Sequence, residues 1–576
     1  MEMTASTHAP APLRRLIRLL RPERGDIRAI VIYSIGIGGL TLAVPIAVQS
    51  IVNTVAFGSL VQPLIVITLM LLVGLSIGAA MRALQTYTLE IMQRRIFVRV
   101  VSDLANRLPR ARIESFDRSH GPELVNRFFD VITVQKVSAQ LLLDGLPIAL
   151  QGTIGLVVLA FYHPILLAFD IVLLALLLFI IFILGRGAIR TAIEESYAKY
   201  AVAGWLEEIA RHPLAFKHKG ASEFARVGAD STVRQYLDAR GRHFSVLFRQ
   251  MVSAFTLQAL ASTALLGLGG WLVIEGRLTL GQLVAAELIV TVVVASFAKL
   301  GKHLESFYDL MAAVEKLGHL LDLPLEQPHG QLVAPGDGPA AVQLNNVSFD
   351  YGDDRPVIRG LSIEIQAGDR VGISGPNGSG KSTLIDLLFG LRAPTSGRIA
   401  LDGIDYREQG LAELRRAITT IQEPEIFEGT ISENVLLGRS DISPDQVRSS
   451  LEAVGLLDEV LAMPLGLQTR LITDGAPLSS GQARRLQVAR AIAGRPRLLI
   501  VDEALDDLAI DRRDQILQSL IDRNAPWTLI VTSHAPMVLG KMDRVIALDG
   551  EVDVTPTARH DNPELNLATP ASLKEK

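Results

Sequence analysis

Six long runs of apolar residues dominate the first half of the chain. They lie at about residues 29–52, 60–82, 140–162, 165–185, 251–274 and 281–301. Each run is close to the length of about 20 residues that an α-helix needs to cross the hydrocarbon core of a bilayer. The pattern therefore predicts six membrane-spanning helices within a domain of residues 29–312.

The polar stretches between these runs differ in length and charge. The connections after the first, third and fifth runs are short and nearly uncharged, whereas residues 83–139 and 186–250 are long, charged and helix-like. We expect the spans to continue out of the membrane as long helices there. Each long connection contains a break, "IESFDRSHGPE" or "ARHPLAFKHKGAS". Short helices at these breaks could contact a soluble domain, and ordinary solvated loops are the alternative.

The basic residues indicate the orientation of the spans. Arginines precede the first span and follow the second and the fourth, at Arg14, Arg15, Arg18, Arg21, Arg24, Arg28, Arg82, Arg94, Arg95, Arg99, Arg186 and Arg190. Because positive residues collect on the cytoplasmic side, both ends of the chain are expected in the cytoplasm, with residues 1–28 as a cytoplasmic segment. No small-residue cleavage site follows the first apolar run, so we expect a retained span rather than a signal peptide.

The pattern changes after about residue 340. Short apolar strands alternate with amphipathic helices and turn signals, which favours an α/β domain at 341–552. A Pro/Gly-rich stretch, "LPLEQPHGQLVAPGDGPA", lies just before it and predicts a linker at 313–340. The tail at 553–576 is rich in Pro, Asn and charge and is expected to be disordered.

The composition agrees with a membrane protein that carries a soluble part. Of 576 residues, 49% are hydrophobic and 20% are charged, and the mean hydropathy is +0.33. This is too apolar for an ordinary soluble protein. A formal net charge of -4 gives no reason to expect a nucleic-acid partner. The sequence has no cysteine, so disulfides and thiol chemistry are excluded.

A glycine-rich stretch from Gly375 to Ser382 reads "GPNGSGKS". It follows the strand-like "RVGIS" and precedes the helix-like "TLIDLLFGL", so it fits G-x-x-x-x-G-K-[ST] in the strand–loop–helix context that this phosphate-binding motif requires. The glycines let successive backbone N–H groups point at phosphates, and the helix N-terminus adds a positive dipole end. We expect Lys381 to neutralise the β- and γ-phosphates and Ser382 to bind Mg²⁺. A chance glycine-rich turn is the alternative.

Two acids end the apolar run "RLLIV". Asp502 stands where an acid that holds Mg²⁺ belongs, directly or through water. Glu503 is placed to orient and deprotonate the water that attacks the γ-phosphate. A capping or surface pair is the alternative, which the neighbouring phosphate-binding motif makes less favoured. Together the two motifs predict an ATPase that uses ATP and Mg²⁺.

With these motifs on the chain, the stretch "LSSGQARRLQVARA" at 478–491, just before "LLIVDE", resembles the signature sequence of ABC ATPases. The resemblance covers nearly the whole chain, and its layout is similar to that of ABC exporter half-transporters. It implies an all-α six-helix transmembrane domain with long cytoplasmic helix extensions, followed by an α/β P-loop ABC ATPase domain.

The resemblance also implies further site residues. Tyr351 matches the aromatic residue that stacks on adenine, Gln422 the loop residue that reaches Mg²⁺, and His534 the residue that contacts the γ-phosphate. Ser479, Gly481 and Gln482 match signature residues that cover the γ-phosphate of the opposite subunit. The nucleotide itself is expected to lie on the phosphate loop, at Gly375, Asn377, Gly378, Ser379, Gly380, Lys381, Ser382 and Thr383.

Three departures from the family pattern stand out. Ser480 replaces a glycine of the usual LSGGQ, and "TRLITDG" at 469–475 lacks a Glu/Arg pattern that the exporters carry. The usual "SALD" after the catalytic Glu is Asp506-Asp507-Leu508-Ala509, so that Ala509 stands where the family has an Asp that communicates across the dimer. We therefore expect intact hydrolysis and weak coupling between sites.

The resemblance implies a homodimer in the bacterial inner membrane, in contact with membrane lipids. ATP binding would close the nucleotide-binding domains and hydrolysis would reopen them, with the helix tips near Phe116–Glu123 and Pro213–Ser222 carrying the motion. The stretches "ELVNRFFDV" and "GRLTLGQLVAAE" are similar to bacterial peptide and protein secretion transporters, which suggests a peptide or protein substrate and a periplasmic adaptor. A peptidase domain is not expected. A lipid or small-molecule exporter or flippase, or a regulatory ABC ATPase, is the alternative.

Two acids lie inside predicted spans, Asp170 in the fourth and Glu287 in the sixth. Acids within a membrane are functional candidates by default, so a polar or cationic substrate pathway is one interpretation. The alternative is that they reach the outer interface or bond to a neighbouring helix.

Overall fold

The computed structural model describes residues 12–56, 61–117, 125–326, 336–352, 356–472, 475–506 and 508–548. The chain divides into two compact units between Leu325 and Glu326. The tail predicted at 553–576, most of the tip predicted near Phe116–Glu123 and part of the predicted linker lie outside the described residues.

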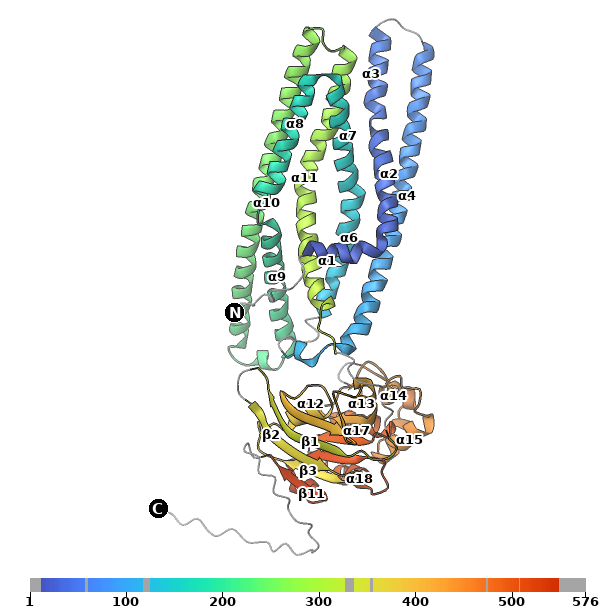
Figure 1. The fold of residues 1–576 in the computed structure, drawn as a ribbon, viewed down its shortest axis with the longest axis vertical. Coiled ribbons are helices and arrows are strands. Elements are labelled where there is room, and N and C mark those ends of the chain that lie inside the picture. The colour runs from blue at the N-terminus through green and yellow to red at the C-terminus, as the bar shows by residue number, and fades with distance from the viewer. Residues whose placement is uncertain are drawn as a thin grey trace, which may run out of the picture. The chain divides into compact units, whose positions relative to one another are not determined.

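The first unit is helical (Figure 1). Most of its long helices run side by side, and α1 crosses them partway along their length. Short π-helical turns at Leu141–Gly145 and Phe179–Leu184 continue α6 and α8. The helices are α1 Pro12–Leu20, α2 Arg24–Thr41, α3 Ala43–Ala56, α4 Val61–Arg107, α6 Asp130–Gln140, α7 Leu146–Tyr162, α8 Pro164–Leu178, α9 Ala188–Arg211, α10 Ala221–Ile274 and α11 Leu280–Leu321.

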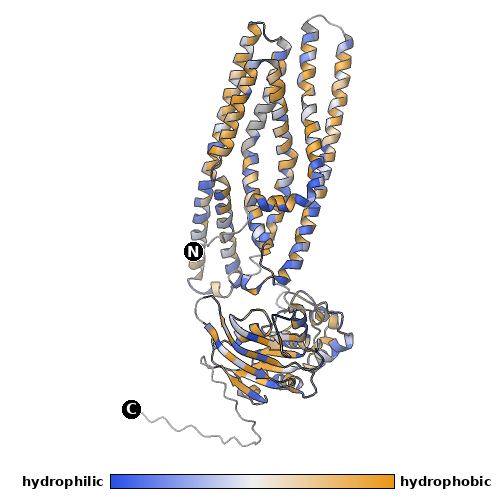
Figure 2. Ribbon diagram, in the orientation of Figure 1, coloured by the Kyte–Doolittle hydropathy of each residue, from blue (hydrophilic) through white to orange (hydrophobic). Residues whose placement is uncertain are grey.

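The length of these helices confirms the predicted extensions beyond the membrane. The helix α4 has 47 residues and α10 has 54, each more than twice the length that a bilayer needs. Hydrophobic residues are concentrated toward one end of the long helices (Figure 2). Within the described residues, five segments are long and apolar enough to cross a membrane: Pro12–Asn53, Gln62–Arg110, Arg127–Phe161, Pro164–Leu184 and Ala221–Ile274. The sixth predicted span lies in α11, where the side chains of 292–298 are outside the description.

The helix α11 extends further than the sequence analysis predicted. It continues to Leu321, so the first part of the segment predicted as a linker is helical. The reason is that Val314, Leu317 and Leu320 recur at helical spacing and are buried in one cluster with residues of α1 and α4. The second predicted break, within 186–250, is confirmed, because α9 ends at Arg211 and α10 begins at Ala221.

A buried ion pair connects three helices in the part of the first unit beyond the predicted spans. Lys316 of α11 and Asp130 of α6 are 2% and 7% exposed, and their charged atoms are 3.0 Å apart. Tyr200 of α9 donates its hydroxyl to the same carboxylate, and its ring lies 3.9 Å from the Lys316 ammonium. Burial lowers the pKa of Lys316 to about 8, while the charge and hydrogen bond of Asp130 oppose that shift.

The second unit contains two main sheets. An antiparallel sheet has the order β2-β1-β4-β5, and a parallel sheet has the order β11-β3-β10-β9-β6. The strands β7 and β8 form a separate pair. The strands are β1 Val342–Asp350, β2 Pro356–Ile365, β3 Arg370–Ser374, β4 Ser396–Leu401, β5 Ile404–Asp405, β6 Ile418–Ile421, β7 Gly429–Thr430, β8 Arg470–Leu471, β9 Leu498–Asp502, β10 Thr528–Thr532 and β11 Arg544–Ala547.

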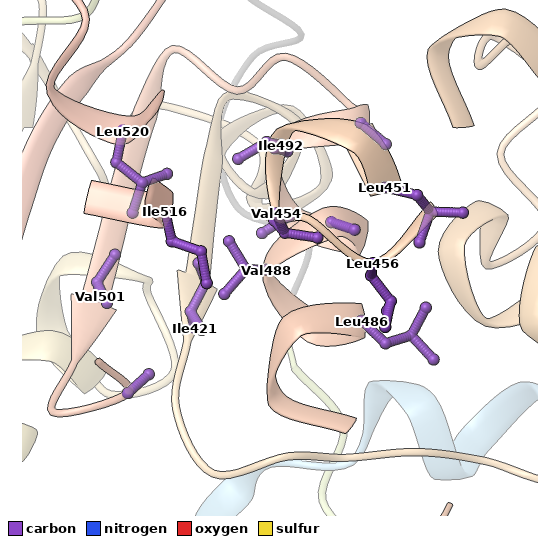
Figure 3. Packing of buried hydrophobic residues seen from close by; sticks show 14 of the residues in the cluster. Ile421, Leu451, Val454, Leu456, Leu486, Val488, Ile492, Val501, Ile516 and Leu520 are labelled. Carbon is purple, nitrogen blue, oxygen red and sulfur yellow. The ribbon is translucent and has the colours of Figure 1, made fainter. Parts of the chain in front are cut away.

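Helices cover the parallel sheet, so its central strands are buried on both faces. All five residues of β10 are buried, and the strand reads as the nearly continuous apolar run that such strands require. Ile421 of β6 and Val501 of β9 pack with residues of α17 and α18 in one cluster (Figure 3). The helices are α12 Lys381–Leu388, α13 Leu411–Ala417, α14 Ile431–Leu436, α15 Pro444–Ala453, α16 Leu457–Leu461, α17 Ser480–Ala493, α18 Ile510–Ile521 and α19 Pro536–Leu539.

Arg370, the first residue of β3, is 2% exposed. Its guanidinium donates to the backbone carbonyls of Gly368, Trp527 and Asp522, at 2.7 to 2.9 Å. Its backbone N–H donates to the carboxylate of Asp543, which precedes β11. The guanidinium thereby connects the amino ends of β3 and β10 with the end of α18, and the backbone N–H of the same residue adds the start of β11.

The Lys316–Asp130 pair gives a testable stability prediction. Lys316→Met leaves a buried carboxylate without its counter-charge, so the free energy of unfolding should fall by about 3–5 kcal/mol. Adding Asp130→Asn removes the charge and keeps an acceptor for Tyr200, so it should recover most of the loss. Thermal unfolding of the detergent-solubilised protein measures both effects.

The matched control is Arg94→Gln, which breaks an exposed pair with Glu90 on α4. Exposed pairs contribute little, so this change should stay within about 0.5 kcal/mol. A Lys316→Met protein that is as stable as the Arg94→Gln protein would show that the buried pair does not hold these helices together.

Candidate functional site

The site residues predicted from the second half of the chain gather where the parallel strands end. The phosphate loop follows β3, Asp502 ends β9, His534 follows β10 by two residues, and Gln422 follows β6 by one. The register places Thr532 beside both Ile373 and Asp502, and Ile421 beside Val501. The carboxyl edge of this sheet is where open α/β sheets bind ligands.

The phosphate loop has the backbone shape that its glycines allow. Gly378 and Gly380 have φ values of 83° and 93°, in the left-handed region that other residues rarely adopt. A side chain at Gly375 would lie 2.6 Å from the carbonyl oxygen of Leu548, so the loop leaves no room for one. The hydroxyl of Ser379 is buried and has no hydrogen-bond partner within the described residues. A cavity of about 420 Å³ opens here, lined by the loop, Val357 and Glu503.

Lys381 lies at the centre of the site and is 6% exposed. Its ammonium donates to the carbonyls of Gly375 and Pro376, at 3.0 and 3.3 Å. It also lies 3.4 Å from the carboxylate of Glu503 and 3.2 Å from Nε2 of His534. The same Nε2 is 3.1 Å from Glu503 Oε1. The structure therefore brings together a cation, a carboxylate and an imidazole that come from three separate motifs.

Asp502 is held in place by two hydroxyl groups. Thr532 Oγ1 donates to its carboxylate at 2.6 Å, and Ser382 is a second hydrogen-bond partner. Burial raises the pKa of Asp502, and the charge of Glu503 adds to this, while both hydrogen bonds and Lys381 oppose it. A divalent cation beside the carboxylate would favour its ionised form.

Glu503 has an unusual backbone conformation. Its φ is 51°, in the left-handed region, which is costly for a residue with a β-carbon. Its N–H donates to the carbonyl and the hydroxyl oxygens of Thr532, each at 3.0 Å. These bonds hold the turn that points the carboxylate at Lys381 and His534. Backbone strain of this kind is found most often at functional sites.

The sequence analysis did not assign a role to Asp506 at this site. The carboxylate of Asp506 accepts hydrogen bonds from the hydroxyl of Ser533 at 2.5 Å and from the backbone N–H of His534 at 2.9 Å. It therefore positions the segment that carries His534. The sequence signal was the replacement of the usual "SALD", but the pairing with a segment 27 residues away could be read only from the structure.

The remaining predicted residues make contacts outside the group of Lys381, Glu503 and His534. Tyr351 donates to or accepts from Thr383 Oγ1 at 2.9 Å, and the Arg392 guanidinium lies 4.9 Å from its ring. Ala509 is the N-cap residue just before α18 and forms no side-chain cap. Asp507 and the middle of the segment 469–475 lie outside the described residues.

The signature residues form the start of a helix. The Ser479 hydroxyl accepts from the N–H of Gln482, and the Gln482 side chain accepts from the N–H of Ser479, a capping box at the N-terminus of α17. Gln482 also donates to Glu459 at 2.9 Å. Within the described residues, the side-chain hydrogen bonds of Ser479 and Gln482 connect them to each other and to Glu459 of α16, and they do not reach the phosphate loop.

The donor groups fit ATP and Mg²⁺. The buried Ser379 hydroxyl without a partner, the positive-φ glycines and the Lys381 ammonium all suit phosphate oxygens. Ser382, Asp502 and Gln422 offer a hydroxyl, a carboxylate and an amide oxygen, the hard donors that Mg²⁺ prefers beside substrate phosphates. Within the described residues there is no group of three His, Cys, Asp or Glu side chains that could hold a metal alone.

Comparison with known proteins covers both units. Residues 27–209 match the family described as the ABC transporter transmembrane region, and residues 358–506 match the family described as ABC transporter. The ABC multidrug transporter mdr2 of Aspergillus fumigatus is 30% identical over 570 residues, which is 93% of this chain and 70% of that protein. The leukotoxin translocation ATP-binding protein LktB of Mannheimia glucosida is 27% identical, over 90% of this chain and 74% of that one.

A solved structure, that of a bacterial Atm1-family ABC exporter with ATP bound, is similar in fold with a TM-score of 0.81. It is 22% identical and the match covers 93% of this chain and 94% of that one. The predicted fold class, a helical membrane domain followed by an α/β ABC ATPase domain, is thereby confirmed. The chain is an ATPase of the membrane that has the architecture of an ABC exporter, and it belongs to the ABC transporter family.

Proposed function

We propose that this chain is a half-transporter that works as a homodimer and couples ATP hydrolysis to the export of a substrate. The observation that carries the proposal is the meeting of Lys381, Glu503 and His534 within 3.4 Å at the sheet edge of a chain that also has membrane-spanning helices. The distribution of arginines supports a cytoplasmic location for both termini. The bacterial inner membrane is the proposed location.

The proposed mechanism assigns each group a task. The phosphate loop and Lys381 bind the triphosphate, and Tyr351 supports adenine. Mg²⁺ held by Ser382, Asp502 and Gln422 would neutralise charge on the phosphates. Glu503 takes a proton from the attacking water, and His534 orients the γ-phosphate. The contact of His534 with Glu503 supports these roles, because it sets both groups on the same side of the loop.

The signature residues are proposed to act on the partner's nucleotide. Ser479, Gly481 and Gln482 stand at the N-terminus of α17, where unpaired N–H groups and the helix dipole favour an anion. Each chain has one phosphate loop and one signature. Two chains in head-to-tail arrangement would therefore form two equivalent sites.

The second cytoplasmic tip is proposed to transmit the motion. Trp205, Phe216 and Phe224 pack with ring centroids 5.7 to 6.4 Å apart, and the indole N–H of Trp205 donates to the carbonyl of Ala225. This cluster stiffens the turn between α9 and α10, while Leu214 at its end is 77% exposed. A rigid tip with an exposed apolar side chain suits contact with another domain.

A peptide or protein is the proposed substrate, with a periplasmic adaptor as partner. The support is the similarity of "ELVNRFFDV" and "GRLTLGQLVAAE" to secretion transporters and the match to a leukotoxin translocation protein. The match to a multidrug transporter favours small apolar molecules as the second candidate. Peptides of about 20 residues and a small fluorescent hydrophobic dye, offered separately in vesicles with ATP, distinguish the two. ATP-dependent movement of the dye alone would overturn the peptide assignment.

The role of Glu503 gives a sharp prediction for hydrolysis. Glu503→Gln should retain ATP binding and lower the rate of hydrolysis by about 10²–10⁴, since a general base contributes about that much. Lys381→Ala should instead weaken nucleotide binding. Nucleotide binding and phosphate release, measured on the same nanodisc samples, separate the effects, and near-normal turnover in Glu503→Gln would contradict the assignment.

The interdigitated dimer can be tested by complementation. Mixed dimers of a Lys381→Ala chain and a Ser479→Arg chain keep one intact pair of loop and signature, so their ATPase activity should exceed that of either parent. Ser443→Arg is the matched control, because Ser443 forms the same capping box with Gln446 on α15. The Ser443→Arg substitution should leave hydrolysis nearly unchanged. Mixed dimers as inactive as both parents would argue against sites shared between subunits.

Ala509 gives a prediction about cooperativity. An alanine cannot form the side-chain hydrogen bond by which the family's aspartate connects the two sites, so communication should be weak. Coupling of about 1–3 kcal/mol is typical where sites communicate, and here the Hill coefficient for ATP should be near one, rising in Ala509→Asp. A wild-type coefficient near two that the substitution leaves unchanged would show that this position does not limit communication.

A further inference from the structure

Asp170 is the only charged residue of α8, and it lies well inside the predicted fourth span. At a rise of 1.5 Å per residue it is about 9 Å along the helix from Pro164. It is 6% exposed, whereas the next two residues, Ile171 and Val172, are 62% and 58% exposed. The carboxylate therefore faces the helices packed against α8 rather than lipid.

The residues one turn to either side of this carboxyl group are buried in clusters of apolar side chains. Leu166, one turn before it, is buried with Leu159 of α7 and Leu265 of α10. Leu173, one turn after it, is buried with Ala261 of α10, with Ile289 of α11 and with Leu42. Figure 2 shows α8 as a mostly hydrophobic helix. Within the described residues neither carboxyl oxygen has a hydrogen-bond partner.

No basic residue is available nearby to neutralise a negative charge. The sequence has no Lys or Arg in 34–56, in α7, or in 251–274 of α10, and Lys299 is the first in α11. The titratable groups of 34–56, α7, 251–274 and 280–298 are Tyr162 and Glu287, and His163 precedes α8. The turn between α10 and α11 adds Arg277, which pairs with Glu275. Glu287 is itself an acid at a similar depth, about 10 Å from Leu280. An ionised Asp170 would thus be an isolated buried charge.

An isolated charge in an apolar interior costs so much free energy that the group neutralises itself instead. We propose that Asp170 is a proton-binding site of the membrane domain, and that its carboxyl group carries a proton at neutral pH when α8 is packed against α7 and α10. The ligand is a proton rather than an organic cation, because Asp170 is 6% exposed and the positions one turn to either side of it are buried in apolar clusters. The site goes beyond the proposed ATPase cycle and does not depend on it.

A structural role explains this residue less well. Protonation removes the charge but still leaves two polar oxygens without partners, so a leucine would be more stable at this position. Burying this carboxyl group costs free energy, and it does so in a helix whose other residues are nearly all apolar. Such cost without structural gain is typical of functional groups in membranes.

Infrared spectroscopy of the full-length protein in lipid nanodiscs tests the site. The difference between wild type and Asp170→Asn at neutral pH should contain the carbonyl-stretch band of a protonated carboxylic acid. The matched control is Glu275→Gln, an exposed acid in the turn after α10, whose difference spectrum should contain a carboxylate band. A difference spectrum for Asp170→Asn that contains a carboxylate band instead would overturn the proposal.

A second measurement uses the unchanged protein, in case Asp170→Asn does not fold. A membrane-permeant carbodiimide adds to protonated carboxylic acids in apolar surroundings, and mass spectrometry locates the adduct. The peptide containing Asp170 should be labelled at neutral pH, several-fold more than at alkaline pH. The absence of that adduct at neutral pH, in a sample where exposed acids react with a water-soluble carbodiimide, would show that Asp170 does not hold a proton.

Discussion

The parallel alignment of β3, β10, β9 and β6 is the constraint on which the nucleotide site depends. Phosphate loop, Glu503, His534 and Gln422 are far apart in sequence, and they meet because parallel strands deliver their carboxyl ends to one edge. A shift of one residue in the pairing of β9 would turn Asp502 to the opposite face of the sheet. The buried clusters on the two faces of β9 make that shift costly, because it would exchange Leu499 and Val501 with Leu498 and Ile500 and disrupt the packing of both clusters.

Sequence reasoning predicted those parts of the site whose functional residues are adjacent in the sequence. The phosphate loop and the pair Asp502-Glu503 are contiguous, and their context of strand, loop and helix was readable from apolar runs. The hydrogen bond from the His534 N–H to Asp506 could not be predicted from the sequence, because two loops must adopt particular conformations before these residues meet. The left-handed conformation of Glu503 was equally unpredictable, since glutamate gives no local signal for it.

In the membrane unit, hydropathy predicted the helices but not the polar contacts between them. The pairing of Asp130 with Lys316 joins residues 186 apart, and nothing in the periodicity of either helix selects that partner. The continuation of α11 to Leu321 was not predicted, because the proline and glycine residues that follow it indicated a linker. The apolar spacing of Val314, Leu317 and Leu320 was the signal that should have extended the helix.

The two ends of the parallel sheet differ in their hydrogen bonding, and Arg370 is the reason at the amino end. At the amino end a buried guanidinium holds three carbonyl groups together, while at the carboxyl end the polar groups face a cavity. Local opening is easiest where few buried bonds must break. In hydrogen–deuterium exchange, amides near Arg370 and Thr528 would therefore exchange only with unfolding of the whole domain, whereas those of the phosphate loop can exchange from the folded state.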